Sequence, residues 1–162
     1  HMFGPNSIEV DDMIIQSDQL LGYIMDQIQK LSIKDQLNLI VLSDHGMSQV
    51  SKEKLIFLDE FIPEDMVIFH GGGAVGMINQ KKRSSLSLKS LFTKQRYSKK
   101  EIFKHIEFVE FMDVYKRENI PKHLNFLNAD SPDFLLVANN EWFITNRKKS
   151  EKIGKTLNFV CF

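Results

Sequence analysis

Residues 37–47, LNLIVLSDHGM, contain an apolar run that ends abruptly in an aspartate and a histidine. The run 37–42 predicts a strand buried on both faces, as strands of parallel sheets are. An amphipathic helix is predicted before it, over residues 8–31, with Ser7 as its N-cap. A helix followed by a buried strand indicates an α/β fold, here a partial, mostly parallel sheet with flanking helices.

Further elements are predicted downstream. Ser98 and Glu101 have the spacing of a capping box and open a short helix to Ile106. The glycines at 71–73 predict a place where the backbone passes close to a neighbour or a ligand. The expected strands are 67–69, 109–115 and 134–138, with 141–145 returning after Asn139-Asn140 as the hairpin partner of 134–138.

Length and composition restrict the classes of protein. With 162 residues, the chain is expected to be a single fragment of one catalytic domain, residues 1–162. Lys+Arg and Asp+Glu both number 21, so net charge favours neither nucleic acid nor an anionic membrane, and no nucleic-acid-specific site is expected. No apolar run approaches the roughly 20 residues of a membrane span. The single cysteine, Cys161, excludes an internal disulfide.

Residues 80–100 form a basic variable loop that contains no acidic residue. Its composition predicts a solvated surface segment. The alternative is an anion-attracting flap near a phosphate site.

Asp44 and His45 follow the predicted strand, at the edge where open α/β sheets bind ligands. A carboxylate oxygen beside an imidazole nitrogen suits zinc or a similar divalent ion. Gly46 is expected to allow the tight turn that brings both side chains to one side. The alternative is that Asp44 caps a turn and His45 lies at the surface. His70 could line a site, whereas His105 and His123 are expected to be structural or exposed.

These motifs, taken together, resemble a known family. LNLIVLSDHGM looks like the signature of the nucleotide pyrophosphatase/phosphodiesterase family, in the alkaline phosphatase superfamily. HMFGPNS at residues 1–7 is similar to the family's GHxxGPxS segment, and the helix 8–31 joins the two motifs. Residues 114–121 and 132–143 look like the family's later strands. The resemblance covers most of the chain and implies an alkaline-phosphatase-like fold.

The resemblance also implies a chemistry. The family hydrolyses phosphodiester and pyrophosphate bonds with two zinc ions and a phospho-threonine intermediate. Asp44 and His45 would bind the zinc that activates the nucleophile, and His1 would bind the other zinc. The alternative for His1 is that His1-Met2 is a remnant of cloning. The family's nucleophile and several metal ligands match no residue here, so the chain looks like an internal fragment and no catalytic residue is assigned.

Three functions are compatible with this pattern. The first is a fragment of a zinc-dependent hydrolase of nucleotides, inactive by itself unless Ser43 or Ser48 replaces the missing nucleophile. The second is a non-catalytic remnant or interaction module, which could form a homo-oligomer through an exposed sheet edge. The third is a phosphodiesterase of choline phospholipids with the same fold. The family resemblance implies an extracellular or periplasmic location. Native substrate, source and oligomeric state do not follow from the sequence.

Overall fold

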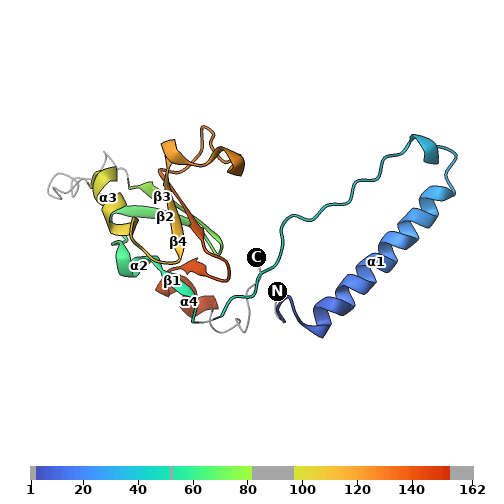
Figure 1. The fold of residues 1–162 in the computed structure, drawn as a ribbon, viewed down its shortest axis with the longest axis horizontal. Helices are drawn as coiled ribbons and strands as arrows, with labels where there is room; N and C mark the ends of the chain where they lie inside the picture. Colours follow the sequence, from blue (N-terminus) through green and yellow to red (C-terminus); the bar gives the residue numbers. More distant parts are fainter. Residues whose placement is uncertain (1–2, 52, 82–96, 154–162) are drawn as a thin grey trace, which may run out of the picture. The chain divides into compact units, whose positions relative to one another are not determined.

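The computed structural model describes residues 3–51, 53–81 and 97–153 (Figure 1). It divides into two compact units, with the described residues up to Gln49 in unit 1 and those from Val50 onward in unit 2. His1 and most of the basic loop 80–100 lie outside the described residues.

Unit 1 begins with the predicted helix, α1, which spans Ile8–Gln29. The Ser7 hydroxyl accepts a hydrogen bond from the Val10 N–H at 3.3 Å, which confirms Ser7 as the N-cap. A short 3-10 helix, η1, follows at Lys34–Gln36 (Figure 1). Within the described ranges, no helix is long and apolar enough to cross a membrane.

The buried strand predicted at 37–42 is not formed in unit 1. The segment is extended but pairs with no other strand among the described residues, and Ile40 and Leu42 are 77% and 81% exposed. The apolar stripe of α1 is likewise uncovered, since no residue of that helix is buried. A strand needs a ladder partner for its backbone N–H and C=O groups, and the described part of unit 1 supplies none.

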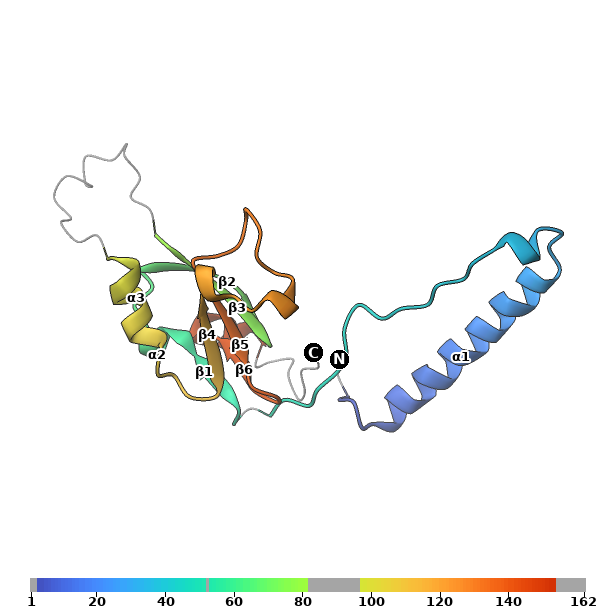
Figure 2. The ribbon, with the colours of Figure 1, turned by 45° about the horizontal axis from the view of Figure 1, so that its top comes forward.

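Unit 2 contains a four-stranded sheet and a separate strand pair (Figure 2). Its described strands are β1 (Leu55–Phe57), β2 (Val67–Gly72), β3 (Val75–Gln80), β4 (Met112–Lys116), β5 (Phe134–Ala138) and β6 (Phe143–Thr145). The sheet has the order β2-β3-β5-β4. The α/β class with flanking helices is confirmed, and β1 and β6 pair in parallel. Parallel pairs are fewer than expected for a mostly parallel sheet, because the other three described pairs are antiparallel.

The predicted hairpin between β5 and β6 is wrong. Both edges of β5 are occupied, by β3 on one side and β4 on the other, so a returning strand has no edge to join. After the turn the chain instead pairs with β1. Ile144 and Gly73 also exchange backbone hydrogen bonds of 2.9 and 2.8 Å, which tie β6 to the β2–β3 turn.

The close backbone approach predicted at the glycine run is confirmed. Gly71 has a φ of +81°, and a Cβ there would lie 2.9 Å from the Val75 carbonyl oxygen. Gly72 has a φ of +130°, and its Cβ would lie 3.1 Å from the Ile144 carbonyl oxygen. Both positions therefore need glycine, for conformation as well as for space.

The core of unit 2 forms where α3, Lys99–Ile106, packs against the sheet. The capping box is confirmed, and its hydrogen bonds from Ser98 lower the pKa of Glu101 below its ordinary value. The described residues also form α2 (Leu58–Phe61), α4 (Arg147–Ile153) and the 3-10 turns η3 (Arg117–Asn119) and η4 (Lys122–Leu124). The most buried apolar side chains are those of Ile78, Ile102, Ile106, Leu136 and Ile144.

Candidate functional site

Asp44 and His45 follow the extended segment of unit 1, and their side chains turn toward each other. The Nε2 atom of His45 lies 3.5 Å from Oδ2 of Asp44. Both side chains are open to solvent, at 48% exposure for His45 and 87% for Asp44.

Two hydrogen bonds orient the pair. The backbone N–H of His45 donates to Oδ1 of Asp44 at 3.0 Å, which leaves Oδ2 on the side of the imidazole. Nδ1 of His45 lies 2.7 Å from the Gly46 carbonyl oxygen. A carbonyl oxygen only accepts, so Nδ1 carries the proton in this contact, and in the neutral imidazole the lone pair is then on Nε2. Histidines that bind metals are commonly oriented by such a bond from their other ring nitrogen.

The donor set fits zinc. Ligand atoms about 2.0–2.1 Å from a tetrahedral zinc ion are about 3.4 Å apart, and the separation of Nε2 and Oδ2 is 3.5 Å. Among the described residues, however, no group of three or more His, Cys, Asp and Glu side chains gathers in one place. His1, the third predicted ligand, lies outside the described residues. The described pair thus offers two candidate donor atoms, one oxygen and one nitrogen.

The remaining candidates have surroundings of their own. Ser43 donates its hydroxyl proton to the His45 carbonyl oxygen at 2.5 Å, so it stabilises the loop. His70 is exposed on β2 opposite Met77. Nδ1 of His105 lies 3.1 Å from the Phe61 carbonyl oxygen, a structural contact, and His123 is exposed on η4.

Gly46 acts differently from the prediction. Its φ is not in the left-handed region, and no atom lies within 4 Å of a Cβ built there. The backbone conformation at Gly46 is therefore one that other residues also adopt, and the turn in this unit does not depend on the special freedom of glycine. The sequence did not predict that the Gly46 carbonyl would orient His45. Every residue has a backbone carbonyl, so no residue type indicates which carbonyl accepts a side-chain hydrogen bond.

The sequence matches the family model described as type I phosphodiesterase / nucleotide pyrophosphatase over residues 1–159. It is 28% identical over 152 residues to human ectonucleotide pyrophosphatase/phosphodiesterase family member 5, covering 93% of this chain and 29% of that protein. It is 29% identical over 157 residues to human bis(5'-adenosyl)-triphosphatase, covering 95% and 31%.

The fold comparison agrees. The human family member 5 structure superposes with a TM-score of 0.70 at 27% identity, covering 92% of this chain and 37% of that one. A murine family member 5 structure, an inactive variant in complex with AMP, has a TM-score of 0.74 at 24% identity, covering 100% and 38%. These structures support an alkaline-phosphatase-like α/β fold.

Unit 2 has a mixed α/β fold with flanking helices, and the family match extends over both units. The chain belongs to the type I phosphodiesterase/nucleotide pyrophosphatase family, a family of hydrolases. It spans about 30% of the length of the curated relatives it matches.

Proposed function

We propose that Asp44 and His45 are two zinc ligands of a hydrolase that cleaves phosphodiester or pyrophosphate bonds of nucleotides. The observation that carries the proposal is the 3.5 Å separation of Nε2 and Oδ2, within a segment that matches the family. The family match supports hydrolysis, and the donor types support zinc.

Each residue has a distinct part in this proposal. Bound zinc would lower the pKa of the nucleophile and neutralise charge on the phosphoryl oxygens. Asp44 would supply an anionic oxygen ligand. His45 would bind through Nε2, held in this tautomer by the Gly46 carbonyl. The nucleophile would be a threonine that residues 1–162 do not supply, forming a phospho-threonine intermediate. A second zinc would be bound in part by His1, if that residue is native.

The substrate class is proposed from the relatives. Their names refer to nucleotide pyrophosphates and to bis(5'-adenosyl) triphosphate, which supports a nucleotide substrate. Their description as ectoenzymes supports a location outside the cell. A choline phospholipid substrate and a non-catalytic module remain the alternatives.

A substrate panel tests the proposal. A protein that carries residues 1–162 within a catalytic domain of the relatives' length would be assayed with zinc on bis(5'-adenosyl) triphosphate, a nucleotide phosphodiester and a choline phosphodiester. We expect hydrolysis of the nucleotide substrates. Preference for the choline substrate would contradict the substrate assignment, and cleavage of none would favour the non-catalytic module. The 162-residue chain alone should be inactive, and zinc-dependent turnover abolished by Ser43→Ala or Ser48→Ala would refute an external nucleophile.

A further inference from the structure

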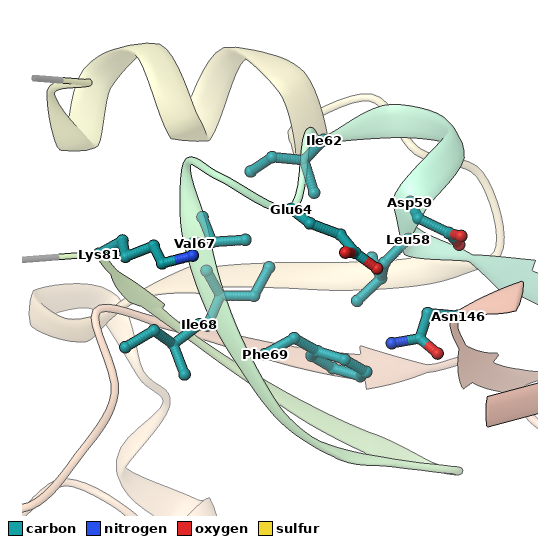
Figure 3. Close-up of a pocket in the computed structure, with 10 residues that line it drawn as sticks. Leu58, Asp59, Ile62, Glu64, Val67, Ile68, Phe69, Lys81 and Asn146 are labelled. Carbon is teal, nitrogen blue, oxygen red and sulfur yellow. The ribbon is translucent and has the colours of Figure 1, made fainter. Parts of the chain in front are cut away.

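Unit 2 contains a pocket of about 270 Å³ between β2, β3 and the α2 segment (Figure 3). Its apolar lining includes Leu58, Ile62, Val67, Phe69 and Ile78. Four of these side chains, all but Phe69, are less than 10% exposed. The volume lies just below the range of about 300–1,000 Å³ that holds drug-sized molecules. The pocket therefore suits a smaller ligand with an apolar body.

The acidic side of this pocket is already occupied by internal partners. Glu64 accepts a 2.6 Å hydrogen bond from the Lys148 ammonium, and this contact raises the pKa of Lys148. Both carboxylate oxygens of Asp59 accept from the Arg147 N–H, at 3.1 and 3.2 Å. Oδ1 of Asn146 accepts from the Lys149 N–H at 2.8 Å. These acceptors stabilise the start of α4, so a cationic ligand would have to compete with the protein's own donors.

Lys81 contributes the opposite charge from the other side. Its side chain extends toward Val67, at the margin of the pocket (Figure 3). In the ranges 3–51, 53–81 and 97–153, the Lys81 ammonium makes no ion pair, whereas Lys148 pairs with Glu64. The Lys81 ammonium therefore favours an anion on this side of the pocket.

We infer that this pocket binds a small amphipathic carboxylate, with its carboxylate on Lys81 and its aliphatic chain on the apolar lining. The charges select the sign of the head group, because the pocket carboxylates are hydrogen-bonded within the protein, whereas the Lys81 ammonium makes no ion pair with the other described residues. The buried aliphatic lining selects the tail, since each buried methylene contributes favourably. A chain of about eight carbons suits a pocket whose volume lies just below the usual range for ligand pockets.

Octanoate is the probe that tests this inference on the full 162-residue chain. Methyl NMR would follow Ile62 and Ile78 in the pocket, and Ile14 and Ile40 in unit 1 as exposed reference positions. We expect saturable shifts at the pocket methyls and much smaller shifts at the reference methyls. Equal shifts at both sets would overturn the inference, because they would show general adsorption to apolar surface.

The contact between the carboxylate and Lys81 is tested by changing the charge of the residue and of the ligand head group. Lys81→Gln should weaken octanoate binding about fivefold, the range of an exposed ion pair, and should change octanol binding less than twofold. Lys122→Gln on η4 is the matched control and should change neither. Octylamine should bind less tightly than octanoate. Unchanged octanoate affinity in Lys81→Gln, equal loss for octanol, or tighter binding of octylamine would each contradict the assignment.

Discussion

Replacing His45 with alanine is expected to lower kcat/KM for a nucleotide phosphodiester on the order of 1,000-fold, in a protein that carries this sequence within a catalytic domain of the relatives' length. The reason is the loss of a ligand at the proposed metal site. A bound metal ion contributes several kcal/mol to stabilising charge in the transition state, and each 1.4 kcal/mol is about tenfold in rate. Steady-state kinetics with zinc present would measure the effect.

The matched control for this change is His123→Ala. His123 is also an exposed histidine, but it lies on η4 of unit 2. It should leave kcat/KM within about twofold, since exposed substitutions away from a site have small effects. Comparable losses in the two variants would show that removal of His45 acts through something other than a metal site.

Replacing Leu136 with alanine is expected to lower the free energy of unfolding of unit 2 by about 2–5 kcal/mol, the usual cost of such a cavity. Leu136 is fully buried on β5, the strand that pairs with both β3 and β4. Trp142 is the chain's one tryptophan, and it stacks on Phe111 with ring centroids 3.9 Å apart. Its fluorescence during urea titration therefore reports the unfolding of unit 2.

Leu127→Ala is the control with the same chemistry. Leu127 is 55% exposed, so its truncation should change the free energy of unfolding by about 0.5 kcal/mol or less. If Leu136→Ala were as mild as this control, β5 would not be an inner strand of a packed sheet.

Local signals in the sequence predicted the elements that depend on neighbouring residues. Ser7 and the Ser98–Glu101 capping box mark helix starts, because the hydrogen bonds that satisfy the first turn are made within a few residues. The apolar run at 134–138 coincides with β5. Strand pairing was predicted less well, because it depends on which edges other strands already occupy. β6 therefore joins β1, although the turn before it resembles that of a hairpin.

The same difference between local and long-range features applies to the candidate site. Asp44 and His45 are adjacent in sequence, so their proximity needs no tertiary structure and could be predicted. The tautomer of His45 depends on where the Gly46 carbonyl points, which the backbone conformation alone decides. The pocket that joins Lys81, Glu64 and Asn146 could not be predicted, because these residues come from three separate parts of the chain.

The proposed metal pair can be tested most directly by titrating zinc into the isotope-labelled 162-residue chain and recording long-range proton–nitrogen NMR of its histidines. A partial ligand set binds weakly, so the titration should extend to millimolar zinc. The account predicts that Nε2 of His45 shifts progressively while Nδ1 stays protonated, and that Asp44→Asn reduces the shift. An unchanged His45 signal, or an equal response at exposed His70 and His123, would contradict the assignment of Asp44 and His45 as zinc ligands.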